Sequence, residues 1–176
     1  KNPNSYGKDL RANGNVKSLG GSECVFEVAG TCYTNLALPT PLSREQCEAQ
    51  KDDLGIKVCN SDNDYWAGAV AHCGGVQNLP TPAQLAEIAT DLYGISIGAN
   101  TSKYSITMDQ TKPYVSILET VSGGSVSNGA GDAVRIRSGQ ESSNGIVYGR
   151  AFHSVYTAVT SGGRANNDNL AVCVDN

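Results

Sequence analysis

The six cysteines are the residues whose type and spacing say most about the chemistry of this chain. They stand at positions 24, 32, 47, 59, 73 and 173, with no Cys-x-x-Cys pair and only two histidines in 176 residues. Because a zinc site would need more closely spaced ligands, this pattern favours disulfides. Disulfides persist in oxidising compartments, so we expect a secreted domain that lies outside the cell or on its surface. The alternative is a set of buried free thiols in a cytosolic protein.

A polar run before the last apolar segment is a candidate ligand-binding site. It consists of Asn166, Asn167, Asp168 and Asn169. Calcium accepts oxygen ligands of these types, and Glu141 or Asp132 could complete a set, although about six oxygens are needed. Asn and Asp are also favoured in solvated turns, where their side chains bond local backbone amides. We therefore expect no cofactor, with calcium as the open alternative.

The ionisable residues form no recognised catalytic motif. The Walker loop and the His-Glu-x-x-His zinc motif are absent. Asp132 and Glu141 could be drawn together as a glycosidase-like pair, but the sequence gives no distance between them. His72 ends a predicted helix and His153 lies on a predicted strand, and surface positions are expected for both. We predict that the protein is not an enzyme.

The composition is that of one ordinary globular domain. The chain is 39% hydrophobic and 17% charged, with a formal net charge of -4. This charge gives no attraction for nucleic acid or anionic lipid, and no window approaches the roughly 18 apolar residues of a membrane span. Because Lys1 is not an initiator methionine, we expect a fragment that was cut or processed from a longer chain.

The elements that would position these residues begin after a loosely ordered N-terminal segment, residues 1–22, and we assign residues 23–176 to a single domain. Two apolar runs around Ala29-Gly30 predict a hairpin that a Cys24–Cys32 bond would staple, with a plain loop as the alternative.

Capping signals predict three helices. Ser43 and Gln46 form a capping box that opens a helix ending at Gly55, with Cys47 inside it and Cys59 just beyond. A second helix follows the caps at 62–64 and stops at Gly74-Gly75, and its buried face comprises Trp66, Ala69, Val70 and Cys73. The third starts at Thr81-Pro82 and ends at Gly94, and its apolar stripe comprises Leu85, Ile88, Ala89 and Leu92.

Beyond residue 94 the chain turns to β-branched and aromatic runs, which predict short strands: ISIG, YSITM, YVSILETV, AVRIR, GIVYGRAF, SVYTAV and LAVCV. Residues 122–132 and 160–169 are expected to be long polar loops. Helices first and strands second predict an α+β fold, with helices packed on a small antiparallel sheet. One core is expected to contain Trp66, Leu85, Ile88, Leu92, Tyr148 and Phe152.

Several of these segments, taken in order, resemble C-type-lectin-like domains of bacteria. The resemblance rests on Trp66-x-x-Ala69-x-x-x-Cys73, on Leu79-Pro80-Thr81-x-x-Gln84-Leu85, on the Ser-rich stretch 137–143 with Tyr148 and Phe152 after it, and on the final Ala171-Val172-Cys173-Val174. It covers roughly residues 61–176, and it implies a disulfide-stapled, C-type-lectin-like version of the α+β fold. The Glu-Pro-Asn tripeptide of sugar-binding calcium sites is absent.

The resemblance also implies a disulfide pairing. In that family the helix cysteine bonds the cysteine of the last strand, which here would join Cys73 to Cys173. Proximity and elimination then pair Cys24 with Cys32 and Cys47 with Cys59, although six cysteines allow fifteen connectivities.

Bacterial domains of this type with extra cysteines occur in surface adhesins and as the heads of type IV pilins or pseudopilins. The resemblance therefore implies a non-enzymatic, extracytoplasmic recognition or assembly module whose partners are a protein or glycan surface ligand or neighbouring filament subunits. Loop 160–169 and the turn at 140–144 should form its contact surface, flanked by Tyr148, Arg150 and Tyr156; the alternative is that both are only connections. Two rival functions stay open: a cysteine-using enzyme of the formylglycine-generating type, which shares the broad fold, and a purely structural filament subunit.

Overall fold

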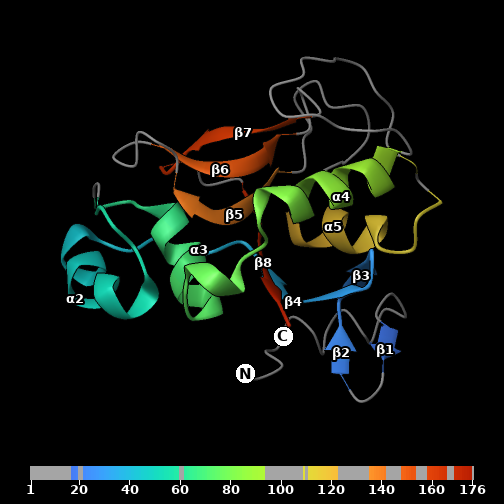
Figure 1. Ribbon diagram of the computed structural model, residues 1–176, viewed down its shortest axis with the longest axis horizontal. Coiled ribbons are helices and arrows are strands. Elements are labelled where there is room, and N and C mark those ends of the chain that lie inside the picture. The colour runs from blue at the N-terminus through green and yellow to red at the C-terminus, as the bar shows by residue number, and fades with distance from the viewer. Residues whose placement is uncertain are drawn as a thin grey trace.

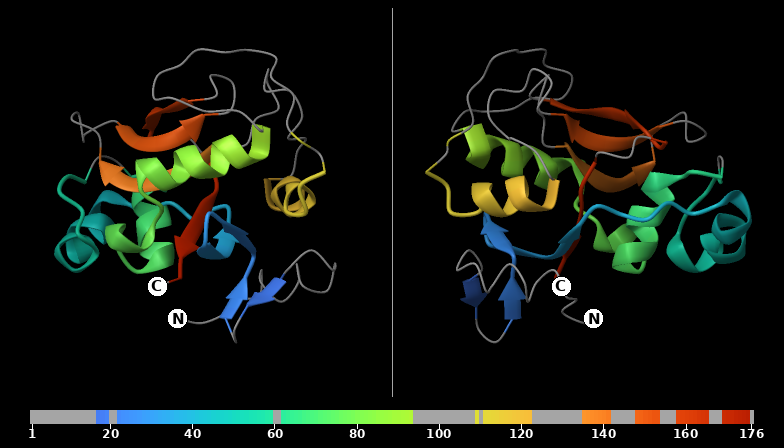
Figure 2. Two further views of the ribbon diagram at one scale, coloured as in Figure 1. Left: turned by 45° about the vertical axis from the view of Figure 1, so that its right-hand side comes forward. Right: turned by 180° about the vertical axis from the view of Figure 1, so that it is seen from behind.

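The computed structural model describes residues 17–19, 22–59, 62–93, 109, 111–122, 135–141, 148–153, 158–165 and 169–175. In chain order the elements are β1 (Lys17–Leu19), β2 (Ser22–Cys24), β3 (Phe26–Val28), β4 (Thr31–Ala37), α2 (Arg44–Leu54), α3 (Tyr65–Cys73), the 3-10 turn η1 (Val76–Asn78), α4 (Pro82–Tyr93), α5 (Val115–Ser122), β5 (Arg135–Glu141), β6 (Tyr148–His153), β7 (Ala158–Gly163) and β8 (Ala171–Val174). Helices α2 and α3 gather at one end of the molecule and α4 and α5 at the other (Figure 1; Figure 2). The mixture of helices and small antiparallel sheets agrees with the predicted α+β class.

The strands divide among separate small sheets, whereas the sequence predicted one. Their orders are β1-β2, β3-β4-β8 and β5-β6-β7, and every neighbouring pair is antiparallel. The last strand connects two of them: β8 pairs with β4, and Leu170 just before it forms a parallel bridge with Ile136 of β5. The C-terminal strand therefore holds the two larger sheets together.

The capping predictions are confirmed at both ends of α2 and α3 and at the start of α4; the predicted stop at Gly94 lies outside the described residues. Ser43 and Gln46 exchange side-chain bonds with each other's backbone N–H groups at 2.9 and 3.1 Å, and Thr81 and Gln84 do the same at 2.9 and 3.1 Å. Gly55 ends α2 in the left-handed conformation, with φ of 79°. These bonds satisfy backbone N–H groups at the helix start that have no partner within the helix. Because the bonded residues are only three positions apart, the sequence alone could locate the caps.

The predicted hairpin is also present. Strands β3 and β4 pair from Phe26 opposite Tyr33 to Val28 opposite Thr31. Both turn residues between them, Ala29 and Gly30, have positive φ, of 52° and 81°, as a tight two-residue hairpin turn requires.

Three predictions about the chain were wrong in part. The run YVSILETV is helix α5, because Tyr114, Ile117, Leu118 and Val121 lie at i, i+3, i+4 and i+7 and are all buried. β-Branched content suggested a strand there, but burial of one helical face outweighs intrinsic propensity. Residues 160–163, predicted as loop, belong to β7, and 17–19 of the predicted loose N-terminal segment form β1.

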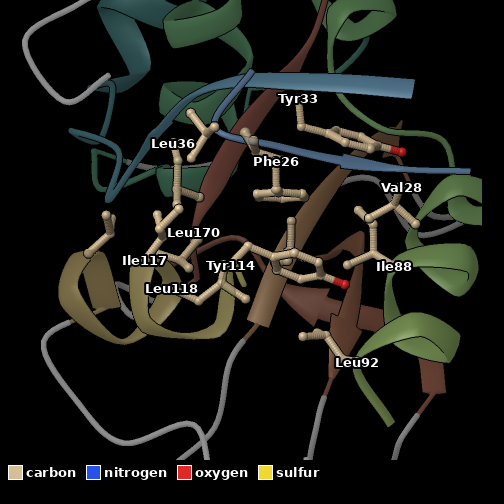
Figure 3. Packing of buried hydrophobic residues seen from close by; sticks show 14 of the residues in the cluster. Phe26, Val28, Tyr33, Leu36, Ile88, Leu92, Tyr114, Ile117, Leu118 and Leu170 are labelled. Carbon is tan, nitrogen blue, oxygen red and sulfur yellow. The ribbon is translucent and has the colours of Figure 1, made fainter. Parts of the chain in front are cut away.

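The predicted single core is two clusters. Leu85, Ile88 and Leu92 of α4 pack with β3, β4 and α5, whereas Trp66 lies in a second cluster with residues of α2, α3 and β8. In the first cluster Phe26 stacks between Tyr33 and Tyr114, with ring centroids 5.2 and 4.8 Å away (Figure 3). The side chains of Tyr148 and Phe152 lie outside the described part.

All six cysteines are joined in the predicted pairs. The bonds are Cys24–Cys32, Cys47–Cys59 and Cys73–Cys173, with Cα atoms 5.2, 5.8 and 5.4 Å apart. The first staples β2 to β4, the second closes the chain after α2, and the third joins the end of α3 to β8. Three disulfides in a domain of this size indicate folding in an oxidising, extracytoplasmic compartment.

Candidate functional site

The two segments predicted to form the contact surface start from the same end of the β5-β6-β7 sheet. Glu141 at the end of β5 pairs with Gly149, and Tyr148 at the start of β6 pairs with Gly163 at the end of β7. The chain therefore leaves β5 toward residues 142–147, and leaves β7 toward residues 166–168, from neighbouring strand ends. Residues 142–147 and 166–168 themselves lie outside the described residues, as does Asp132.

A buried arginine connects the bases of these two segments. Arg164 directly follows β7, and its Nη1 lies 3.1 Å from the Oε2 of Glu141 at the end of β5. Its Nη2 and Nε also bind the carboxylate of Asp64, at 2.7 and 3.0 Å. The side chains of Arg164 and Asp64 are fully buried, so their charges compensate each other away from water.

Glu141, which the sequence placed on the contact surface, is held by further donors. Its two oxygens accept the backbone N–H groups of Lys57 and Val58 at 2.9 and 3.2 Å, and only 9% of its side chain is exposed. The same segment is also bound by Arg164, whose Nη2 donates to the carbonyl oxygen of Val58 at 2.7 Å. The Cys47–Cys59 bond ties this segment to α2. Glu141 therefore fixes the end of β5, from which the first of the two predicted contact segments leaves the sheet.

Trp66 forms one wall around the arginine. The Arg164 guanidinium carbon lies 4.5 Å from the centroid of the Trp66 ring, an arrangement in which the ring quadrupole stabilises the cation. The indole N–H of Trp66 donates to the carbonyl oxygen of Ser138 at 2.9 Å. The backbone N–H of Tyr65 donates to the carbonyl oxygen of Arg164 at 2.8 Å. The start of α3 thus holds β5 and the chain after β7 together.

Sequence reasoning missed this network. Asp64 was recognised only as a helix cap, and it does accept the N–H of Ala67 at 2.9 Å, but nothing in its sequence context pointed to Arg164. Arg164 stands in a run of Gly, Ser and Asn that is typical of an exposed loop. An isolated arginine in such a run carries no sequence signal of burial.

The other predicted site residues divide into two groups. Asn169 is buried, with 2% of its surface exposed, so its side chain is not presented at the surface as the sequence suggested. Tyr148 and Arg150 belong to β6, but their side chains lie outside the described residues. Asn166, Asn167, Asp168 and Tyr156 also lie outside them.

Of the two histidines, only His72 has a side chain within the described residues, and it has a structural contact. His72, expected at the surface, is partly buried with Nε2 2.6 Å from the carbonyl oxygen of Asn35, which joins α3 to β4. The His153 side chain lies outside the described residues. Sequence reasoning also overlooked Gly-Ile-Ser-Ile-Gly at 94–98, which matches the pattern of a nucleophile elbow. That pentapeptide follows helix α4, whereas an elbow follows a strand, and its residues lie outside the described part.

Within the described residues, no group of three or more His, Cys, Asp and Glu side chains is placed to hold a metal ion. None of the helices in that part of the chain is long and apolar enough to cross a membrane. Comparison with protein-family models, curated proteins and solved structures found no match to this chain.

Proposed function

We propose that this domain is a non-enzymatic recognition or assembly head of a bacterial surface structure, of the C-type-lectin-like kind found in pilins and adhesins. The observation that carries the proposal is the ion pair between Arg164 and Glu141. It fixes the two strand ends from which the predicted contact segments leave the sheet.

A fixed base matters because binding costs ordering free energy. Polar loops gain affinity when the scaffold holds their ends, since less conformational freedom is lost on contact. Arg164, Asp64 and Glu141 provide such a base, and the Cys47–Cys59 bond reinforces it. This arrangement supports the proposal that the loops beyond it make the contacts.

The state of the cysteines supports a binding role over the enzyme alternative. An enzyme that works through cysteine needs a reactive thiol or thiolate. All six cysteines of this chain are bonded in pairs, and Cys24 and Cys47 are fully buried.

The test compares how strongly the oxidised domain and a loop variant of it attach to candidate partner surfaces. Beads coated with the domain would be applied to a glycan array and to a surface coated with the same domain. Changing Asn166, Asn167 and Asp168 together to Ala should lower attachment at least about tenfold, which corresponds to about 1.4 kcal/mol of binding free energy. The melting temperature should hardly change, because the three substitutions leave Arg164, Asp64 and Glu141 of the buried network in place.

Ser116→Ala combined with Thr120→Ala, on the exposed side of α5, is the matched control and should attach like the parent. Attachment to the domain-coated surface alone would identify an assembly subunit, and attachment to glycans would identify an adhesin. Full attachment by the triple variant with an intact fold would show that the loop surface is not the site.

A further inference from the structure

The tetrapeptide Leu-Pro-Thr-Pro occurs twice in this chain, at residues 38–41 and at residues 79–82. The first copy lies in the connection from β4 to α2, and the second leads into α4. Because the four residues are the same in both copies, any difference between Thr40 and Thr81 comes from the chain around them.

The first copy is held against α3. Proline pushes the residue before it toward extended backbone, and both Leu38 and Thr40 precede a proline. The carbonyl oxygen of Thr40 lies so close to Gly68 of α3 that a Cβ there would overlap it. Two residues later, Leu42 and Asp64 exchange backbone N–H···O=C bonds at 3.1 and 3.0 Å. The chain between β4 and α2 therefore runs past α3 in a fixed form (Figure 2).

This arrangement presents Thr40 to solvent. Thr40 is exposed, whereas Pro39 before it is buried. Two other exposed threonines, Thr111 and Thr120, donate their hydroxyl protons to an aspartate and to a backbone carbonyl, at 2.6 and 2.9 Å. The Thr40 hydroxyl makes no hydrogen bond to any residue that the structure describes. It is therefore an accessible acceptor on a preformed segment.

Thr81, at the same place in the second copy, is also exposed, but its hydroxyl oxygen is engaged. This oxygen accepts the N–H of Gln84 at 3.1 Å, and the Gln84 side chain accepts the N–H of Thr81 at 2.9 Å. Helix α4 begins at the next residue, Pro82. A group attached to this oxygen would crowd the helix cap, so the second copy is a poor acceptor in the folded domain.

We propose that Thr40 of the folded domain is an O-glycosylation site. Threonines close to prolines are typical sugar acceptors of secreted proteins, and the three disulfides indicate an oxidising, extracytoplasmic compartment. In the transfer, the Thr40 oxygen forms a bond to the anomeric carbon of a phosphate-activated sugar. The bond from that carbon to the donor phosphate breaks, and the phosphate leaves with the bonding electrons. A base of the transferase takes the hydroxyl proton.

The first test is mass spectrometry of the domain isolated from the cells that secrete it. Electron-transfer fragmentation of its peptides locates each added mass on a residue. We expect a glycan at Thr40 and none at Thr81. An unmodified Thr40 would overturn the proposal, and so would a phosphate at this position.

A second test asks whether the fold selects the site. The oxidised domain would be incubated with membranes of the same cells and a labelled nucleotide sugar. A reduced and alkylated sample, shown by circular dichroism to be unfolded, would be treated in the same way. In the folded domain Thr40 should be labelled at least about fivefold faster than Thr81, since freeing a capping hydroxyl costs about that factor. In the unfolded chain the two rates should become similar. Equal labelling of both threonines in the folded domain would overturn the proposal.

Variants identify the accepting group. Thr40→Ser keeps a hydroxyl and should still be labelled, whereas Thr40→Val should lose the label with a nearly unchanged melting temperature, because the residue is exposed. Thr81→Val is the matched control and should leave labelling at Thr40 unchanged. Undiminished labelling of Thr40→Val would place the acceptor elsewhere and overturn the proposal.

A last arm separates the two possible donors, a nucleotide sugar and a sugar carried on polyprenyl phosphate. An antibiotic that sequesters polyprenyl phosphate would be added to the membranes. It should stop the labelling of Thr40 if the sugar passes through the lipid-linked donor, and leave it unchanged if the nucleotide sugar donates directly. Either result at Thr40 supports the proposal and identifies the donor.

Discussion

Arg164 and Asp64 form a fully buried ion pair although they lie one hundred positions apart in the sequence. The Nη2 and Nε of the arginine approach Asp64 Oδ2 at 2.7 and 3.0 Å. The same carboxylate caps α3 by accepting the N–H of Ala67. One aspartate therefore starts a helix and also fixes the chain that leaves β7.

Removing the arginine alone should destabilise the domain strongly. Arg164→Met leaves the carboxylate of Asp64 buried without its cation and removes the partner of Glu141. We expect the free energy of unfolding to fall by about 3–5 kcal/mol. Equilibrium urea unfolding at neutral pH, with disulfides intact, measures this change.

The double variant Asp64→Asn with Arg164→Met tests the cause. Because it removes both buried charges, it should be more stable than Arg164→Met alone, even though it weakens the cap of α3. A double variant that loses the sum of the two single effects would show that the charges do not interact.

Gly68 allows α3 to approach the chain after β4. A Cβ at this position would lie 1.9 Å from the carbonyl oxygen of Thr40, closer than atoms can come. Gly68→Ala should therefore lower the free energy of unfolding by about 3 kcal/mol through forced backbone shifts. Gly74→Ala is the control, because its Cβ would lie 3.6 Å from the nearest atom and would meet no clash. Only the positive φ of +82° disfavours alanine there, and we expect the free energy of unfolding to fall by about 1 kcal/mol. Equal effects in thermal or urea unfolding would contradict the close-packing argument.

Each disulfide should stabilise the folded domain in proportion to the logarithm of the length of the loop that it closes. Cys73–Cys173 closes a sequence separation of 100 residues and Cys24–Cys32 one of 8. Loop-closure entropy predicts losses of about 4.7 and about 2.5 kcal/mol when each pair is replaced by Ala. Unfolding of the two double-alanine variants in urea gives the comparison. A larger loss for Cys24 and Cys32 would indicate that packing, not chain entropy, sets their contributions.

Tyrosine burial makes stability fall at high pH. Burial, with a smaller effect of the nearby Glu87, raises the pKa of Tyr33 to about 12; burial and the hydrogen bond to Asp91 also raise the pKa of Tyr114. Between pH 10 and about 12 the unfolded chain loses the Tyr33 proton that the folded chain keeps. Stability is therefore complete below pH 10 and should fall by about 1.4 kcal/mol per pH unit for each such phenol above it.

Urea unfolding at several pH values measures this slope. Tyr33→Phe should have a shallower slope above pH 10 than the parent, because it has one phenol fewer to ionise. An unchanged slope would show that Tyr33 ionises alike in the folded and unfolded chains.

The sequence by itself determined the features that depend on neighbouring residues. The capping boxes at Ser43 and Thr81, the stop at Gly55 and the hairpin turn at Ala29 and Gly30 all follow from bonds or dihedral angles within a few positions. The even number of cysteines indicated disulfides, and family resemblance supplied the distant Cys73–Cys173 pair.

The tertiary structure decided the features that depend on contacts between residues far apart in the sequence. Residues 115–122 became helix α5 because one helical face is buried against β3 and β4, and β-branched content alone favoured a strand. Trp66 and Leu85 lie in separate clusters, since an apolar stripe says that a face is buried but not against which partner. Arg164 is buried because Asp64 and Glu141 meet it in space, and burial of a charge is stable only where such partners exist.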